Sequence, residues 1–155
     1  MQYPVDKIRN ICLLGHLGSG KTALAEALLY YTKGTDRLGS REEGTTVCDF
    51  DAEEINRKLS ISTAVAPVYY GDYKINILDT PGEFDFSGEV IQALSACEYA
   101  IITVSARSGV KVGTEKAFKM CKKRGIPVLF YITKMDADSA DYHKVMVQLK
   151  EKFGQ

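Results

Sequence analysis

A glycine-rich stretch near the start of the chain restricts its fold more than any other feature. The stretch reads GHLGSGKT over residues 15–22, with the apolar run ICLL before it and ALAEALLYY after it. Its spacing matches G-x-x-x-x-G-K-[ST] in full, which is typical of a loop that holds phosphate groups between a strand and a helix. We therefore expect a strand, a phosphate-binding loop and a helix in succession. The alternative is a chance glycine turn in front of a helix.

Each residue type in this loop has a physical role. Glycines let backbone N–H groups turn inward around phosphate oxygens, and the N-terminus of the following helix adds partial positive charge. Lys21 is expected to reach the β- and γ-phosphates of a nucleoside triphosphate, and the Thr22 hydroxyl is expected to bind Mg²⁺. The residues expected to bind the nucleotide here are Gly15, His16, Leu17, Gly18, Ser19, Gly20, Lys21, Thr22 and Ala23.

The rest of the chain alternates strand-like apolar runs with helical runs. Strands are expected at residues 8–14, 64–70, 74–78, 99–104 and 126–132, and helices at residues 21–31, 88–96, 113–124 and 139–153. The runs RNICLLG, YAIITVSA and IPVLFYIT are almost continuously hydrophobic, which indicates strands that are buried on both faces. This alternation predicts an α/β fold with helices on both sides of the sheet.

The composition excludes some classes of function. The 155 residues suffice for one domain with a buried core, and 20 basic residues balance 20 acidic ones. A net charge of zero gives no electrostatic reason to expect a nucleic acid or a membrane as a direct partner. The four cysteines show no CxxC spacing, so free thiols are expected ahead of a disulfide or a zinc site. No signal peptide is apparent, so we expect a cytoplasmic protein.

A second phosphate-contacting element is expected at DTPG, residues 79–82, which follows the apolar run INIL. An aspartate at the end of a buried strand is where a phosphate-loop enzyme holds Mg²⁺, often through water, and Asp79 occupies that position. Gly82 has no side chain to keep its N–H away from the γ-phosphate. Because Asp-Thr-Pro-Gly also forms a good turn, a purely structural turn is the alternative.

The element expected to select the base is TKMD, residues 133–136, at the end of the last apolar run. Open α/β sheets bind their ligands at the carboxyl ends of strands. An Asp136 carboxylate there accepts hydrogen bonds from N1–H and the exocyclic amine of guanine, whereas adenine leaves the charge unpaired. Lys134 is expected to lay its alkyl chain along the base, and Thr133 completes the nucleotide-binding set. An exposed Lys-Asp turn is the alternative.

Residues 34–60 do not fit the alternation of strands and helices. The segment GTDRLGSREEGTTVCDFDAEEINRKLS is long, polar and acid-rich, with a weak helical signal at residues 51–58. A loop of this length inside a compact domain is usually functional or mobile. A solvated surface insertion is the alternative.

With these three motifs in order, the chain resembles the GTP-binding domain of translational GTPases, in particular elongation factor G and its relatives, including ribosomal protection proteins. The resemblance extends to EEGTTVCDFDAEEINRKLSI, DTPGEFDFSGEV and KMDADSADY and covers nearly the whole chain. It implies a P-loop GTPase fold with a mostly parallel sheet over residues 1–155. It also implies GTP or GDP with Mg²⁺, a first switch at about residues 34–63 and a second switch at about residues 79–90.

The resemblance further implies a monomer that contacts the ribosome through other domains of a larger protein. A fifth nucleotide motif and a last strand are expected to follow residue 155, so the domain is expected to be truncated before its C-terminal part. Ser60 stands where the family has a threonine that binds Mg²⁺ and keeps the hydroxyl. The expected metal ligands are therefore Thr22, Ser60 and Asp79.

Three further positions depart from the family pattern. Gly18 replaces a frequent aspartate, Thr133 replaces the asparagine of N-K-x-D, and Glu83 replaces the histidine that positions the attacking water. Leu17 and Leu59 match the hydrophobic gate around that histidine. The expected catalytic residues are Lys21, Gly82 and Glu83. Because the charge of Glu83 faces the phosphates, we expect a low intrinsic rate of GTP hydrolysis.

Several functions remain open at this point. The first is a GTPase that acts as the switch domain of a ribosome-associated translation factor. The second is a GTP-binding switch module with little or no hydrolysis, because of Gly18 and Glu83, and a ribosomal protection protein is a further alternative. A small-molecule kinase also fits GSGKT but leaves TKMD unexplained.

Overall fold

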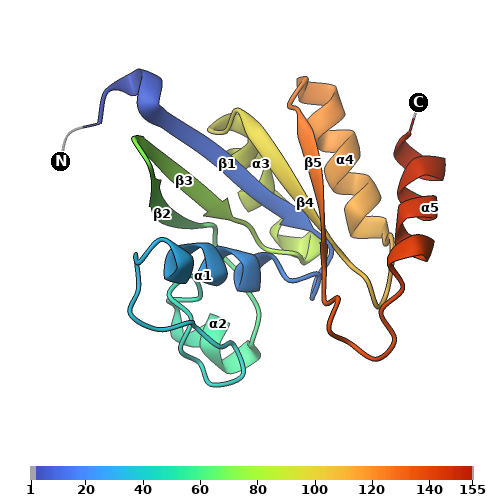
Figure 1. Ribbon diagram of the computed structural model, residues 1–155, viewed down its shortest axis with the longest axis horizontal. Coiled ribbons are helices and arrows are strands. Elements are labelled where there is room, and N and C mark those ends of the chain that lie inside the picture. Colours follow the sequence, from blue (N-terminus) through green and yellow to red (C-terminus); the bar gives the residue numbers. More distant parts are fainter. Residues whose placement is uncertain (1–2, 155) are drawn as a thin grey trace.

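The computed structural model describes residues 3–154 and contains one five-stranded sheet (Figure 1). The strands are β1 (Ile8–Gly15), β2 (Ala64–Tyr70), β3 (Tyr73–Asp79), β4 (Tyr99–Ser105) and β5 (Val128–Thr133). Their order across the sheet is β2-β3-β1-β4-β5, and only the β2–β3 pair is antiparallel. The predicted mostly parallel α/β sheet is confirmed.

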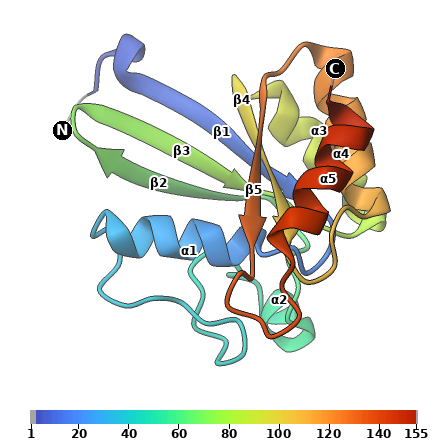
Figure 2. The ribbon, with the colours of Figure 1, turned by 45° about the vertical axis from the view of Figure 1, so that its right-hand side comes forward.

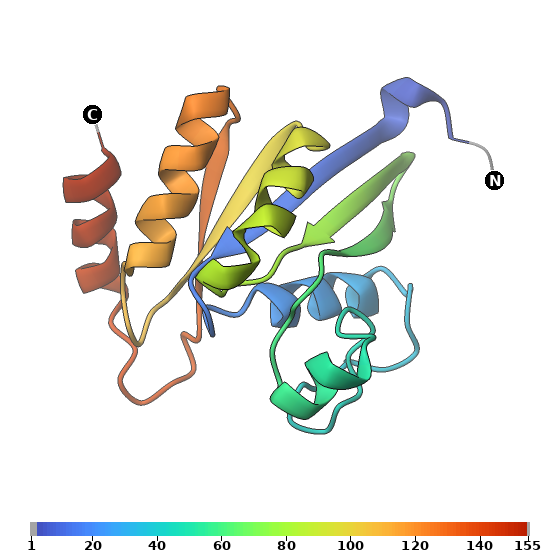
Figure 3. The same cartoon turned by 180° about the vertical axis from the view of Figure 1, so that it is seen from behind.

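Helices cover both faces of this sheet. They are α1 (Lys21–Tyr31), α2 (Ala52–Arg57), α3 (Ser87–Ser95), α4 (Val112–Arg124) and α5 (Tyr142–Phe153), with short 3-10 turns η1 (Val5–Lys7) and η2 (Phe84–Phe86). Helix α1 packs on one face, where α2 and the loops around it lie beyond it, and α3, α4 and α5 lie on the other face (Figure 2). Seen from behind, α3 and α4 lie across β1 and β4 (Figure 3).

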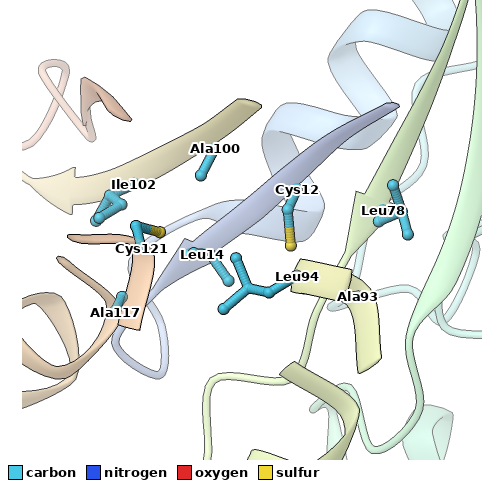
Figure 4. Packing of buried hydrophobic residues seen from close by; sticks show 9 residues of the cluster. All are labelled: Cys12, Leu14, Leu78, Ala93, Leu94, Ala100, Ile102, Ala117 and Cys121. Carbon is cyan, nitrogen blue, oxygen red and sulfur yellow. The ribbon is translucent and has the colours of Figure 1, made fainter. Parts of the chain in front are cut away.

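The buried side chains of β1 explain the two layers. Cys12 and Leu14 join the cluster under α3 and α4, which includes Leu94 (Figure 4). Leu13 points to the opposite face and packs with Leu29 of α1. Adjacent residues of a strand face opposite sides, so a strand that is apolar at every position must be covered twice. Cys12 and the other three cysteines are free thiols.

The main differences from the sequence prediction concern β5 and the last helix. Burial of β5 on both faces was wrong, since Leu129 and Tyr131 are 59% and 46% exposed, and β5 is an edge strand in residues 3–154. Apolar composition alone does not reveal that one face has no covering helix. The last helix begins at Tyr142 rather than at residue 139, because the Asp141 side chain accepts a hydrogen bond from the Lys144 N–H and caps it.

The topology places the loops of interest at one edge. Strands β1, β3, β4 and β5 run in the same direction, so the loops after β1, β3 and β5 leave the same end of the sheet. Ligands in open parallel sheets bind outside this end. No helix within residues 3–154 combines the length and hydrophobicity that crossing a bilayer requires.

Candidate functional site

A cavity of about 480 Å³ opens at this edge of the sheet. It is lined by the loop after β1, by parts of segment 34–63, and by one residue each from the loops after β3 and β5. Of the residues proposed from sequence, those that line the cavity are Leu17, Gly18, Gly20, Lys21, Thr22, Ala23, Ser60, Gly82 and Lys134. Those outside its lining are Gly15, His16, Ser19, Asp79, Glu83, Thr133 and Asp136.

The glycines of the loop after β1 have conformations that restrict other residues. Gly18 and Gly20 have φ angles of 70° and 92°, and Gly20 directly precedes α1. At Gly15 an added Cβ would lie 2.6 Å from the Thr103 carbonyl oxygen. In this tight turn from β1 into α1, a side chain would be strained by the positive φ at Gly18 and Gly20 and would collide with Thr103 at Gly15.

Lys21 is buried under this loop, with 6% of its surface exposed. Its ammonium donates to the carbonyl oxygens of Gly15 and His16, both at 3.3 Å. Burial lowers the pKa of Lys21 to about 8, and the nearby Asp79 carboxylate opposes that shift. The loop thus holds a desolvated cation at its centre, which favours an anionic ligand.

The three proposed metal ligands lie side by side behind the loop. The Thr22 hydroxyl donates to Asp79 Oδ2 at 2.6 Å and lies 3.2 Å from the Ser60 hydroxyl oxygen. Asp79 is 1% exposed, and its Oδ1 is buried with no hydrogen-bond partner among the described residues. Burial raises the pKa of Asp79 to about 6, against the opposing effect of the Thr22 hydrogen bond.

Two charged residues join this group that the sequence did not single out. Arg41 donates from Nε to Asp49 Oδ2 at 2.9 Å and from Nη2 to Oδ1 at 3.1 Å. The same Nη2 donates to Thr22 Oγ1 at 2.6 Å and to Ser60 Oγ at 2.9 Å. Arg41 and Asp49 are eight positions apart in a segment without regular secondary structure. No helical or strand spacing in the sequence could therefore have predicted their ion pair.

Two buried glutamates anchor the remainder of segment 34–63. Glu26 of α1 accepts hydrogen bonds from the backbone N–H groups of Val47 and Cys48, at 2.8 and 2.9 Å. Glu54, which is 0% exposed, accepts from four backbone N–H groups: those of Phe50, Asp51, Ile61 and Ser62. The segment is therefore tied to the domain at these two carboxylates, while most of residues 34–60 are exposed. The spacing of Asp51 and Glu54 is that of a capping box, which agrees with the helical signal at residues 51–58.

The loop after β3 contacts the phosphate loop through its glycine. A Cβ on Gly82 would lie 2.6 Å from the Lys21 ammonium and 2.8 Å from the Leu17 Cα. The next residue, Glu83, lines a separate cavity of about 130 Å³ beside α4. Phe84 follows, with the Lys116 ammonium 3.8 Å from its ring centre. Gly82 is thus against Lys21, while Glu83 lies outside the lining of the larger cavity.

The loop after β5 is tied to the phosphate loop by Thr133. Its hydroxyl donates to the Ser19 carbonyl oxygen at 2.6 Å, and its methyl and Cβ atoms lie 3.3 Å from a Cβ placed on Gly20. Lys134 has a φ angle of 56° and lines the larger cavity. Asp136 is exposed at the rim of this loop. The structure therefore places Thr133 against the phosphate loop and Lys134 at the same cavity, whereas Asp136 is outside the cavity lining.

Comparison with known families identifies this arrangement. The family model of the elongation factor Tu GTP-binding domain matches residues 6–155. The chain belongs to this family. The resemblance drawn from its motifs is confirmed, and this GTP-binding domain has the fold that the motifs implied.

Relatives of this GTP-binding domain are found among translation factors. An elongation factor G-like protein of Mycobacterium tuberculosis is 42% identical over 147 residues, which are 95% of this chain and 21% of that protein. Elongation factor G of Dehalococcoides mccartyi is 33% identical over 151 residues, covering 97% of this chain and 22% of that protein. A mitochondrial ribosome-releasing factor 2 of Scheffersomyces stipitis is 36% identical over 151 residues, covering 97% and 18%. The chain spans about a fifth of the length of these curated relatives.

Solved structures with the same fold agree with this assignment. A crystal structure from Thermus thermophilus superposes with a TM-score of 0.92 at 41% identity, over 96% of this chain and 22% of that chain. Translation elongation factor SelB of Methanococcus maripaludis, in complex with the GTP analogue GppNHp, superposes with a TM-score of 0.69 at 23% identity, over 99% and 28%. The latter supports the fold of the GTP-binding domain alone.

Proposed function

We propose that this domain binds GTP and GDP together with Mg²⁺ and uses GTP hydrolysis as a conformational switch. The observation that carries the proposal is the convergence of a buried ammonium, two hydroxyls and a buried carboxylate on one glycine-rich loop. Lys21, Thr22, Ser60 and Asp79 come from three separate parts of the chain, and all are at most 7% exposed. Burying these groups together is costly, and an anion with its counter-cation offsets that cost.

The donor set fits Mg²⁺. Two hydroxyl oxygens and a carboxylate are hard oxygen ligands, which suit Mg²⁺ better than a softer metal. Asp79 Oδ1 supplies a buried acceptor without a partner among residues 3–154. Thr22 and Ser60 would hold the ion directly and Asp79 through water, and phosphate oxygens would complete its coordination. Bound there, Mg²⁺ would neutralise charge on the phosphate groups.

The base is selected, in this proposal, by the loop after β5. Lys134 lines the cavity, and its alkyl chain can lie along a base plane. Asp136 would pair with N1–H and the exocyclic amine of guanine, a pairing that adenine cannot satisfy. Thr133 supports this loop because its hydroxyl bonds to the phosphate loop at Ser19.

Hydrolysis in this proposal depends on positioning rather than on covalent chemistry. Lys21 and the Gly82 N–H would stabilise the γ-phosphate, and Glu83 would orient or deprotonate the attacking water. Because Glu83 lines the neighbouring cavity, it would have to turn toward the phosphates, and its charge would oppose that approach. We therefore expect slow intrinsic turnover. A switch module without hydrolysis is the second candidate, favoured by the same placement of Glu83.

The domain would act within a larger translation factor. Its relatives carry the names elongation factor G and ribosome-releasing factor, which supports a role at the ribosome through other parts of the protein. We also propose that the domain is cytoplasmic and monomeric.

Displacement of a fluorescent GDP by GTP, GDP and ATP in Mg²⁺ buffer tests the binding function. We expect GTP and GDP to compete and ATP to fail; equal competition by ATP would refute the guanine assignment. Phosphate release by the wild type and by Glu83→His then separates the two candidates. Faster release by Glu83→His supports a slow GTPase, whereas no release from either form, with ribosomes added, supports the switch module.

A further inference from the structure

An arginine reaches the proposed metal site in addition to its three oxygen ligands. Arg41 lies in segment 34–63 and is 28% exposed, whereas its ion-pair partner Asp49 is 2% exposed. The Arg41 guanidinium therefore enters the buried group from the cavity side, and Arg41 is itself part of the cavity lining.

The hydrogen-bond directions around Arg41 are determined by chemistry. A guanidinium can only donate, so the Thr22 and Ser60 hydroxyl oxygens must accept from Nη2. Each hydroxyl then directs its own proton to a carboxylate: Thr22 donates to Asp79 at 2.6 Å, and Ser60 donates to Asp49 at 2.8 Å. One lone pair of each hydroxyl is consequently turned toward the same positively charged nitrogen.

A metal ion held by both hydroxyls would be close to this nitrogen. The Thr22 and Ser60 oxygens lie 3.2 Å apart, and Nη2 is within 2.9 Å of both. Mg²⁺ binds oxygen ligands at about 2.0–2.1 Å, so an ion held by both hydroxyls would lie within about 5 Å of Nη2. A guanidinium and a divalent cation at that distance also repel each other.

We propose that Arg41 is a built-in competitor of Mg²⁺ at this site. Its guanidinium bonds to Asp49 and Ser60 within segment 34–63 and joins the segment to Thr22 of α1, and Mg²⁺ entering with the nucleotide displaces Nη2 from the two hydroxyls. The proposal rests on the proposed function, because it requires a nucleotide and Mg²⁺ at this loop. Its consequence is that metal binding and loss of the Arg41–Thr22 contact are one event.

The test measures how strongly Mg²⁺ slows the release of fluorescent GDP from the whole chain. Relative to wild type, Arg41→Ala should lower the half-saturating Mg²⁺ concentration by about tenfold, the equivalent of one charge-assisted hydrogen bond no longer displaced. In EDTA the same variant should release GDP faster, since a cation beside the phosphates is lost. Arg37→Ala is the matched control, because Arg37 lies in the same segment and forms no ion pair among the described residues.

A double variant separates competition between Arg41 and Mg²⁺ from attraction of Mg²⁺ by the Asp49 carboxylate. Arg41→Ala leaves the Asp49 carboxylate unpaired, and that charge could itself attract Mg²⁺. Arg41→Ala/Asp49→Asn removes the charge and should keep a lowered half-saturating concentration. An unchanged Mg²⁺ dependence in the double variant would overturn the proposal, as would a weakened dependence in Arg41→Ala.

Amide hydrogen exchange supplies a readout that does not need bound nucleotide. In EDTA, residues 39–50 should exchange faster in Arg41→Ala than in wild type, and Arg37→Ala should match wild type. Equal exchange in all three proteins would contradict the role of Arg41 in holding the segment. If wild type binds no GDP in Mg²⁺ at all, the proposed function fails first; if it binds GDP and only the Arg41 variants show no shift, this inference alone fails.

Discussion

Within the candidate site, the phosphate end keeps its charged groups away from water, whereas the base end leaves them at the surface. At the phosphate end, around residues 15–23 and Asp79, the charged side chains of Lys21 and Asp79 are 6% and 1% exposed. At the base end, residues 133–136, Lys134 and Asp136 are both exposed. Buried charges interact more strongly than exposed ones, so affinity should come mainly from the phosphate end and selectivity from the base end.

Removing the buried cation should have the largest effect. Lys21→Ala should weaken GDP binding about 100-fold or more, because truncating one member of a buried charged contact costs several kcal/mol. Equilibrium titration with fluorescent GDP measures this loss. Lys123→Ala, on the exposed side of α4, should bind GDP like wild type. Near-normal GDP binding by Lys21→Ala would remove the phosphate loop from the account.

Replacing the buried carboxylate of Asp79 should stabilise the protein without ligand, although Asp79 is a proposed metal ligand. In metal-free buffer the pKa of Asp79 is raised from its ordinary value of 3.8 to about 6, so the folded protein holds this proton more tightly than the unfolded chain. Its contribution to the free energy of unfolding is therefore full below pH 3.8 and is lost as pH rises through 6. Asp79→Asn should remove that decline and stabilise the apo protein at pH 7.5 by on the order of 2 kcal/mol.

Urea unfolding of both proteins in EDTA between pH 4 and pH 8 measures this prediction. Adding GDP with Mg²⁺ should stabilise wild type far more than Asp79→Asn. Parallel pH profiles in EDTA would show that Asp79 is not titrating as its burial implies.

The base end should respond more weakly. Asp136→Ala should lower GDP affinity about tenfold and reduce the preference for GTP over ATP, since an exposed charge pair contributes less than a buried one. Competition against fluorescent GDP gives both values. Asp138→Ala, two residues along the same exposed loop, is the matched control and should leave the preference intact. A full preference for GTP in Asp136→Ala would place the base reader elsewhere.

The contact between the two ends should have the smallest effect. Thr133→Val removes the hydroxyl that donates to the Ser19 carbonyl and keeps the side-chain volume. One neutral hydrogen bond contributes about 1 kcal/mol, so GDP affinity should fall about fivefold. Thr133→Asn restores a donor and should recover part of that loss in the same titration. A loss in Thr133→Val as large as that in Lys21→Ala would mean that the two ends are not separable.

The sequence could predict the parts of the site that are built from neighbouring residues, but not the contacts between residues far apart in the chain. Gly20, Lys21 and Thr22 are neighbours in the chain, so their spacing alone predicts a phosphate loop. The contact of Arg41 with Thr22 joins residues 19 positions apart, one in α1 and one in the loop region after it, and only the folded chain brings them together. The buried role of Glu26 was hidden for the same reason, because the N–H groups that it binds lie more than 20 residues away.

The exposure of edge strand β5 is the other feature that the sequence did not predict. Leu129 and Tyr131 belong to a run as apolar as that of β1, yet they are exposed because no helix of the described chain covers that face. The apolar composition of a segment indicates a strand, but it does not reveal where the strand lies in the sheet or which of its faces is covered.

The most direct test of the account is amide hydrogen exchange on the wild-type chain with and without GDP in Mg²⁺ buffer. We expect GDP to protect residues 15–23 at the phosphate end and residues 133–138 at the base end, and ADP at the same concentration to protect neither. Protection by both nucleotides alike, or by GDP only at other segments, would contradict a guanine-nucleotide site built from these two ends.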